Sequence, residues 1–277
     1  MIARLMGIVN VTPDSFSDGG LFLDTEAAVA HGRELAAQGA EILDVGGEST
    51  RPGAEGVSAE VELARVGPVV EQLAPRDGNG AAQVSIDTSK LAVAQAALDS
   101  GAEIVNDVTA LRRDREIAGL CADRRATLVL MHMQGEPRTM QRDPTYGDVV
   151  DDVRAFLERQ MELAVREGLS ERRIWIDPGI GFGKTVAHNL ELIRRLGELR
   201  RLGRPIVIGT SRKTFIGKLT GREVGDRLGG TVASSVLALR AGAEVLRVHD
   251  VAELRQAVTV AEAILGRREW RAQAAAR

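Results

Sequence analysis

Polar and charged side chains recur where the short β-branched runs of this sequence end. The run ends carry Asn10, Asp87, Asn106 with Asp107, Asp177, and Arg247 with His249, and the loops after two further runs hold Thr50 with Arg51 and Ser211 with Lys213. A carboxylate accepts two parallel hydrogen bonds, so Asp87 or Asp177 suits the amino and ring N–H edge of a heterocycle. An asparagine complements mixed donor and acceptor atoms, and a lysine donates to a ring carbonyl. The set predicts a site for a flat, nitrogen-rich ring, a pterin or a purine.

A second group in the same set suits an anion. Arg51, Arg247 and His249 are donors of the kind that bind phosphate or pyrophosphate. Asn10 offers an amide oxygen that a hard divalent cation accepts, with its other positions filled by water and phosphate. The residue types therefore indicate a heterocycle that carries phosphate.

The stretch Pro178–Thr185 (PGIGFGKT) has the look of a phosphate-binding P-loop. That motif requires glycine where Pro178 stands, so we reject a nucleotide hydrolase. We interpret the stretch as a glycine-rich loop that lets the backbone approach a ligand.

Three other polar or reactive residues are expected to be structural. Asp107 suits the N-cap of a helix, and Cys121 suits a buried small hydrophobe. His132 ends the fifth run, and we expect it to support the site by packing or hydrogen bonding instead of acting directly.

Composition and charge exclude several classes of protein. A net charge of −3 and a pI of about 5.9 give no general basic field for nucleic acid. The single cysteine forms neither an intrachain disulfide nor a cysteine-based zinc site. No apolar run approaches the roughly 18 residues of a membrane span, and the first residues lack the regions of a signal peptide. We therefore expect a cytoplasmic enzyme with no nucleic-acid or membrane partner.

Eight short aliphatic runs alternate with stretches of helical period, such as Thr25–Gln38, Asp148–Glu167 and Ala252–Leu265. The predicted strands are Arg4–Val9, Glu41–Val45, Gln83–Ile86, Glu103–Val105, Thr127–Leu130, Ile174–Ile176, Pro205–Ile208 and Glu244–Val248. Eight βα units over about 265 residues match a closed α/β fold, the (β/α)8 TIM barrel. It would form one domain over residues 1–277, with a frayed tail over 266–277. A doubly wound open sheet would usually carry a glycine-rich phosphate turn after its first strand, and the sequence has none there.

Two long motifs stand near the start of the chain, Met6–Gly20 (MGIVNVTPDSFSDGG) and Asp44–Gly53 (DVGGESTRPG). Shorter ones follow in order at Ser85–Thr88, Val105–Val108, Met131–Gly135, Ile176–Thr185, Gly209–Lys213 and Arg247–Asp250. Together they resemble the dihydropteroate synthase family, from residue 5 to about residue 265. One departure is that the chain begins directly at its first predicted strand, where many relatives carry a short segment ahead of it.

The resemblance implies a reaction of folate biosynthesis. In it, 6-hydroxymethyl-7,8-dihydropterin pyrophosphate condenses with p-aminobenzoate to give 7,8-dihydropteroate and pyrophosphate. It implies a pterin site of Asp87, Asn106, Asp177 and Lys213. It implies a pyrophosphate site of Thr50, Arg51, Arg247 and His249, with Asn10 acting through Mg²⁺. It implies a p-aminobenzoate side of Phe16, Pro52, Phe182 and Ser211. Asp87, Lys213, Arg247 and His249 are the catalytic candidates, and the family is usually homodimeric, so we expect a homodimer.

Two other functions remain open on the same barrel. A pterin-dependent methyltransferase that serves a corrinoid protein has no need of Asp14–Gly20 or of the Arg247 and His249 pair. A non-catalytic pterin-binding paralogue would be expected to lose several site residues, and none is lost here.

Overall fold

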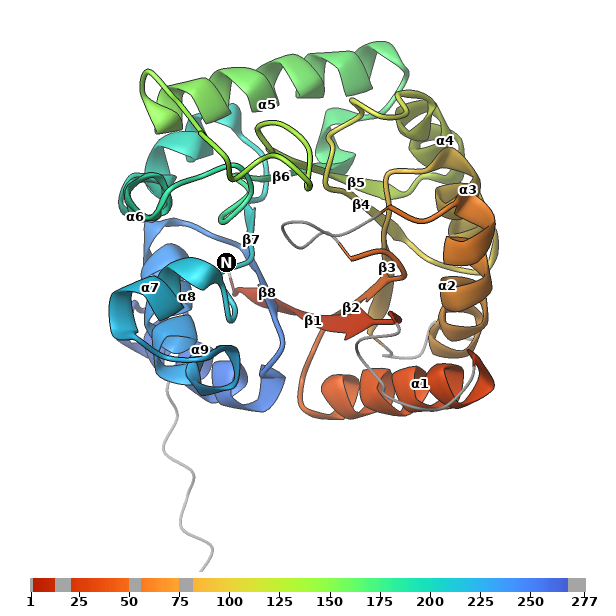
Figure 1. Ribbon diagram of the computed structural model, residues 1–277, viewed down its shortest axis with the longest axis horizontal. Coiled ribbons are helices and arrows are strands. Elements are labelled where there is room, and N and C mark those ends of the chain that lie inside the picture. The colour runs from red at the N-terminus through yellow and green to blue at the C-terminus, as the bar shows by residue number, and fades with distance from the viewer. Residues whose placement is uncertain (1, 13–20, 50–55, 75–81, 269–277) are drawn as a thin grey trace, which may run out of the picture.

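Strands and helices alternate along the chain in the computed structural model, which describes residues 2–12, 21–49, 56–74 and 82–268 (Figure 1). The strands are β1 (Arg4–Asn10), β2 (Ile42–Gly46), β3 (Gln83–Asp87), β4 (Ile104–Asp107), β5 (Thr127–Met131), β6 (Ile174–Asp177), β7 (Val207–Ile208) and β8 (Val245–Val248). The helices are α1 (Leu21–Ala37), α2 (Ala59–Leu73), α3 (Leu91–Asp99), α4 (Glu116–Arg124), α5 (Val149–Arg166), α6 (Val186–Arg194), α7 (Thr214–Thr220), α8 (Leu228–Ala241) and α9 (Val251–Ile264). Short 3₁₀ helices are η2 (Glu171–Arg173), η3 (Leu196–Leu202) and η4 (Val224–Asp226).

All neighbouring strands of the sheet are parallel, in the order β6-β5-β4-β3-β2-β1-β8-β7. The helices surround the strands on the outside (Figure 1). This arrangement confirms the predicted (β/α)8 barrel and rules out the open doubly wound sheet, because the two end strands of the order meet.

The closure between β6 and β7 differs from the rest of the barrel. It consists of one bridge, Ile176 to Ile206, with the Ile176 N–H donating to the Pro205 carbonyl at 3.0 Å. The seventh strand was predicted over Pro205–Ile208, and that range is wrong at its start, since β7 covers only Val207–Ile208. Proline has no N–H to give to a ladder, so Pro205 contributes its carbonyl alone.

Side-chain alternation divides the barrel interior into two layers. Six buried residues from six strands fill the lower layer against Trp175: Met6, Ile42, Ile104, Val129, Val207 and Val245. Successive strand side chains point to opposite faces, so the residue two places further along also points inward. Two places beyond Ile42, Ile104, Trp175 and Val245 stand Asp44, Asn106, Asp177 and Arg247. The interior is therefore apolar below and polar above, at the carboxyl ends of the strands.

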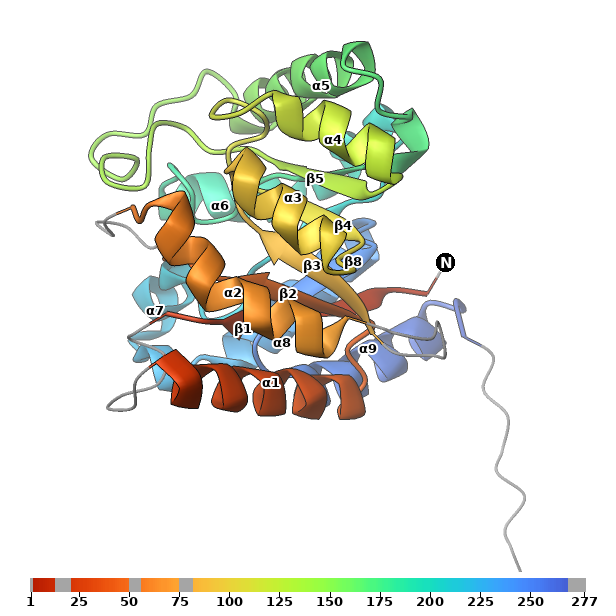
Figure 2. The ribbon, with the colours of Figure 1, turned by 90° about the vertical axis from the view of Figure 1, so that its right-hand side faces the viewer.

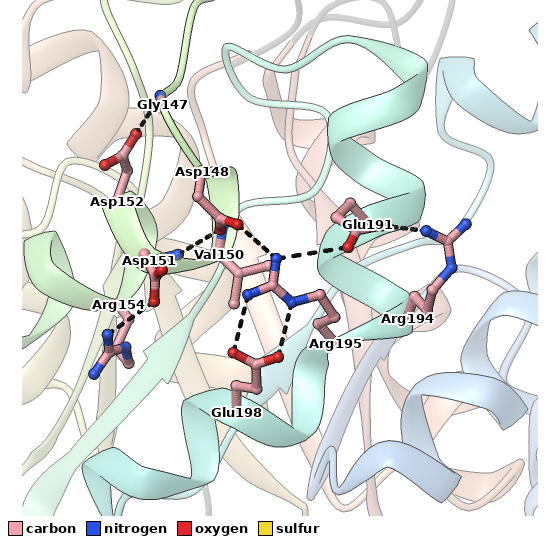
Figure 3. Close-up of polar contacts among 10 residues, drawn as sticks. All are labelled: Gly147, Asp148, Val150, Asp151, Asp152, Arg154, Glu191, Arg194, Arg195 and Glu198. Carbon is pink, nitrogen blue, oxygen red and sulfur yellow. Dashed lines mark hydrogen bonds and ion pairs between the residues drawn. The ribbon is translucent and has the colours of Figure 1, made fainter.

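The predicted helices are found with small shifts at their ends. The predicted Asp148–Glu167 is α5, Val149–Arg166, and the Asp148 side chain caps it by accepting from the N–H groups of Val150 and Asp151. Figure 3 shows that Asp148 also accepts from Arg195, which follows α6. No helix in the described ranges is long and apolar enough to span a membrane.

Candidate active site

Arg247 of β8 lies in the polar upper layer and is bound to two carboxylates. Its Nε donates to Asp44 Oδ2 at 2.6 Å, and its Nη2 donates to Asp87 Oδ2 at 2.7 Å. Burial acts to lower the pKa of Arg247, but Asp44 and Asp87 outweigh it and raise that pKa, so the guanidinium stays charged. Two of the five guanidinium N–H groups are engaged in these bonds, which leaves others for a ligand.

Asp44 was not among the predicted site residues, although it organises two of them. It is fully buried, and its Oδ2 accepts from Arg247 and, at 3.1 Å, from the Asn106 amide nitrogen. That bond fixes the amide of Asn106, because its Nδ2 must face Asp44 and its Oδ1 then faces the other way. The Oδ1 of Asp44 has no hydrogen-bond partner within the described part of the chain.

Asp177 ends β6 with its side chain buried in the same layer. Its Oδ1 accepts from the Gly179 N–H at 2.7 Å. Burial raises the pKa of Asp177 to about 6, although the Gly179 N–H and the charge of Lys213 oppose the rise. Burial also raises the pKa of Asp87, and Arg247 opposes it. Both carboxyl groups therefore titrate well above an exposed aspartate.

Lys213 comes from the loop after β7, next to the start of α7. Its Nζ lies 4.1 Å from the centroid of the Phe182 ring, which belongs to the loop after β6. Burial, together with the charge of Arg247, lowers the pKa of Lys213 to about 8, and Asp177 and Asp87 oppose the shift. Lys213 thus keeps most of its charge at neutral pH and shares it with an aromatic face.

Ser211 and His249 join the loops after β7 and β8. The Ser211 Oγ accepts from the His249 N–H at 3.2 Å and lies 2.9 Å from His249 Nδ1. Burial lowers the pKa of His249 to about 3, helped by Arg212 and Arg247, so the ring is neutral. If the serine hydroxyl donates to Nδ1, the ring proton sits on Nε2, where it is available to an anion. The structure thus brings Ser211 to His249.

Asn10 ends β1, half-buried and opposite Gly46 in the register. Among the described residues no group of three or more His, Cys, Asp or Glu could hold a metal ion. A cation at Asn10 would therefore take its other ligands from phosphate and water. Mg²⁺ is commonly bound in this way, with few protein ligands and a substrate phosphate, so Asn10 fits such an ion.

Four predicted residues, Phe16, Thr50, Arg51 and Pro52, lie outside the described residues. Just before them, Glu48 pairs with Lys90, which also pairs with the fully buried Glu62. This cluster of one lysine and two glutamates was not among the predicted site residues.

Two of the three residues expected to be structural behave as predicted, and the third differs in detail. Cys121 is buried, and His132 packs edge-to-face on Phe156, with ring centroids 4.8 Å apart. Asp107 was expected to cap a helix, but α4 begins only at Glu116. Its carboxylate instead holds the loop after β4, accepting from Thr109 N at 2.8 Å and from Leu111 N at 2.6 Å.

A cavity of about 440 Å³ opens beside Asp87, among the loops that follow β2 to β5. Its walls include Glu48, Thr109, Met133 and Arg138. The site can therefore be entered from this side of the barrel mouth.

Comparison with known proteins gives consistent matches. The family model described as pterin binding enzyme matches residues 6–249. The chain is 43% identical over 261 residues to dihydropteroate synthase of Synechocystis sp., covering 94% of this chain and 89% of that protein. Dihydropteroate synthase of Xanthomonas albilineans with 4-aminobenzoic acid has a TM-score of 0.88 and 49% identity, covering 95% of this chain and 93% of that one. The X. albilineans enzyme with 7,8-dihydropteroate has a TM-score of 0.84 and 46% identity, covering 95% and 94%.

Proposed function

The chain belongs to the pterin-binding enzymes and, among them, to the dihydropteroate synthases, and from this premise we propose how its residues share the reaction. The reaction condenses 6-hydroxymethyl-7,8-dihydropterin pyrophosphate with p-aminobenzoate to give 7,8-dihydropteroate and pyrophosphate, so the protein is a transferase. The roles of Phe16, Thr50, Arg51 and Pro52 rest on the family resemblance, and those of the other residues are supported by the geometry of the site.

The pterin ring binds in the polar upper layer. The observation that carries this assignment is the hydrogen bonding of the Asp177 carboxylate. Of its two oxygens, only Oδ1 is bonded among the described residues, to the Gly179 N–H, so Oδ2 is left for a ligand donor. Asn106 presents its amide oxygen, since Asp44 holds its nitrogen. Asp87 and Lys213 complete an acceptor and donor set that matches the pterin edge.

The pyrophosphate lies toward the loops after β1, β2 and β8. Arg247 offers its remaining N–H groups and neutral His249 offers a ring N–H, with Thr50 and Arg51 from the β2 loop. Asn10 would hold Mg²⁺, which when bound neutralises charge on the pyrophosphate oxygens. Arg247 is held in place by Asp44 and Asp87, so its position is set before substrate arrives.

The bond that breaks joins the pterin methylene carbon to a pyrophosphate oxygen, and its electron pair leaves with the pyrophosphate. Arg247 and His249 stabilise that developing negative charge. The carboxylates of Asp87 and Asp177 stabilise the cationic pterin left behind. The amine nitrogen of p-aminobenzoate forms the new bond to the methylene carbon and then gives a proton to the released pyrophosphate or to water. Phe182, with Phe16, Pro52 and Ser211, forms the side from which the amine approaches. Because the amine itself attacks the methylene carbon, no nucleophilic side chain is needed, and positioning and electrostatics supply the catalysis.

A pyrophosphate-release assay with and without p-aminobenzoate tests this proposal. We expect release that depends on p-aminobenzoate and is nearly lost in Asp177→Asn and His249→Ala. Release that these two variants do not change would refute the residue roles. A pterin-binding paralogue would bind the pterin without release, and a corrinoid methyltransferase would not use the pyrophosphate at all.

We further propose that the protein is a homodimer joined through α8 and α9. These helices form a groove lined by Val232, Val236, Val260 and other apolar residues, with 60% of Val260 and 80% of Ile264 exposed. Arg240 and Glu253 stand in the same groove, so a second copy rotated by two-fold symmetry would bring opposite charges together. Val260→Glu with Ile264→Glu should convert a dimer to a monomer in sedimentation. A wild type that sediments as a monomer would refute it.

A further inference from the structure

Lys184 is one of the few lysines of this chain. Lysine and arginine together number 36, but only four of these are lysines: Lys90, Lys184, Lys213 and Lys218. Lys90, Lys184 and Lys213 stand at the catalytic end, in loops that follow β3, β6 and β7. Lys184 is the lysine of the glycine-rich stretch that resembled a P-loop. It is 3% exposed, and its Nζ is engaged by acceptors of the protein itself.

The Lys184 side-chain nitrogen is surrounded by acceptors of two loops, and burial lowers its pKa to about 7. Its Nζ lies 2.9 Å from His132 Nδ1 and donates to the Phe182 carbonyl at 2.9 Å, with the His132 carbonyl at 3.5 Å. Burial lowers the pKa of His132 to about 2, so the ring is neutral and Nδ1 is free to accept. A buried amine is retained only when it is hydrogen-bonded, so these contacts account for its position.

The two loops are interlocked by their backbones as well. These are the β5α5 loop, residues 132–148, and the β6α6 loop, residues 178–185. A Cβ at Gly179 would overlap the His132 carbonyl oxygen, and one at Gly183 would lie 2.5 Å from the Gln134 carbonyl oxygen. Both glycines have positive φ, which other residues adopt at a cost. The Tyr146 hydroxyl donates to the Gly183 carbonyl at 2.7 Å. The loops therefore pack as one unit.

The far end of the β5α5 loop is tied down separately. Arg195 donates to Asp148 at 2.7 Å and to Glu198 at 2.7 and 3.1 Å (Figure 3). Figure 2 shows the β5α5 loop projecting next to α6, at the barrel end opposite the N-terminus. The loop is thus held at its start by Lys184 and at its end by Arg195.

We propose that Lys184 is a positioning residue for p-aminobenzoate: it fastens the β6α6 loop to the β5α5 loop and so fixes the Phe182 ring beside Lys213. Phe182 lies between the two loops, since its carbonyl accepts from Lys184 and its ring faces Lys213. Its side chain packs against the buried cluster of Val108, Met131, Met133 and Met140. The inference rests on the proposed place of Phe182 on the p-aminobenzoate side.

The test is Lys184→Met, with both substrates varied at pH 8. At that pH Asp177 is ionised, and all variants are compared at the same pH. We expect KM for p-aminobenzoate to rise about tenfold, about 1.4 kcal/mol. KM for the pterin substrate and kcat should stay within about threefold, since the pterin contacts are intact. Unchanged KM for p-aminobenzoate, or an equal rise for both substrates, would overturn the proposal.

Lys218→Met is the matched control, because Lys218 is exposed in the last turn of α7. Its kinetics should equal those of the wild type. Protein labelled with 4-fluorophenylalanine gives a direct readout, since the chain has five phenylalanines and Phe182→Leu assigns the signal. The Phe182 signal should shift or broaden in Lys184→Met and not in Lys218→Met. An unmoved signal would contradict the proposal.

Tyr146→Phe keeps the test decisive if Lys184→Met does not fold. It removes only the hydroxyl that donates to Gly183, and we expect a smaller rise of KM for p-aminobenzoate, about two- to fivefold. An unchanged KM would refute the interlocked loops as a positioning device. Phe182→Ala tests the role of Phe182 separately from that of Lys184. If it leaves KM for p-aminobenzoate unchanged, the place of Phe182 is wrong; if it raises KM and Lys184→Met does not, only the role of Lys184 is wrong.

Discussion

Asp177→Asn is expected to weaken pterin binding and, at pH 8, to make the fold more stable. Burial raises the pKa of Asp177 from 3.8 to about 6. Two pKa units at about 1.36 kcal/mol each mean that the ionised carboxylate costs the ligand-free fold about 3 kcal/mol above pH 6. Asparagine is neutral, and its Oδ1 can keep the bond from the Gly179 N–H at 2.7 Å. The variant should therefore gain up to about 3 kcal/mol of unfolding free energy at pH 8.

The sign of this effect depends on pH and gives the experiment its control. Because the folded pKa lies above the unfolded one, the wild type has its full relative stability below about pH 4 and loses it as the pH rises through about 6. Urea unfolding should show the variant more stable by about 3 kcal/mol at pH 8 and nearly equal to the wild type at pH 4. Calorimetry with a pterin should show affinity reduced by at least about tenfold, because a ligand donor then faces an amide NH₂.

Two results would refute this reasoning. A variant less stable than the wild type at pH 8 would mean that the buried carboxylate is not a net cost. Wild-type affinity for a pterin would mean that Asp177 does not face the ring.

The remaining predictions concern the anion, the metal and the pH profile. His249→Ala should weaken pyrophosphate binding by about 1.5–3 kcal/mol and leave the affinity for a pterin that lacks pyrophosphate unchanged. Equal losses of affinity for the two ligands in calorimetry would contradict the division of the site. Arg247→Ala should do the same but also lower the unfolding free energy by about 3–5 kcal/mol, since Asp44 and Asp87 lose their partner; unchanged urea stability would argue against that pairing. Asn10→Ala should raise the Mg²⁺ concentration for half-maximal activity by about tenfold, about 1.4 kcal/mol, and an unchanged value would place the ion elsewhere. Pterin affinity should rise with pH through about 6 as Asp177 ionises; a flat profile between pH 5 and 7 would exclude this.

The barrel could be predicted from the sequence because each strand is short, aliphatic and followed by a helical period. The polar residues at the carboxyl ends of the strands were also predicted, as Asp177 shows at the end of β6. The limits of β7 could not be predicted, because a run that begins with Pro205 looks like a strand until its neighbours are known. Hydrogen bonding to β6 and β8 decides its length, and that is set by distant parts of the chain.

The composition of the site was predictable, but its internal partners were not. Arg247 was assigned to an anion, and the structure adds that it is paired with Asp44, 203 residues away. The partner of Lys184 was not predicted either, because His132 lies 52 residues earlier in another loop. Asp44, His132 and Lys184 all stand inside the motifs, but a motif does not separate the residues that face a ligand from those that hold them in place. For Asp44 two signals were available, its place at the start of the Asp44–Gly53 motif and its position two places after Ile42.

The single bridge between β6 and β7 makes that junction the weak seam of the barrel. The other neighbouring strands share two to five register pairs, whereas this junction has Ile176 and Ile206 alone among the described residues. Asp177 ends the strand on one side of the seam, and Lys213 follows the strand on the other. A ring that binds both residues would link β6 and β7 where the backbone has few hydrogen bonds. On the proposed roles of Asp177 and Lys213, bound substrate would tie β6 to β7, and product release would leave the junction with its single bridge.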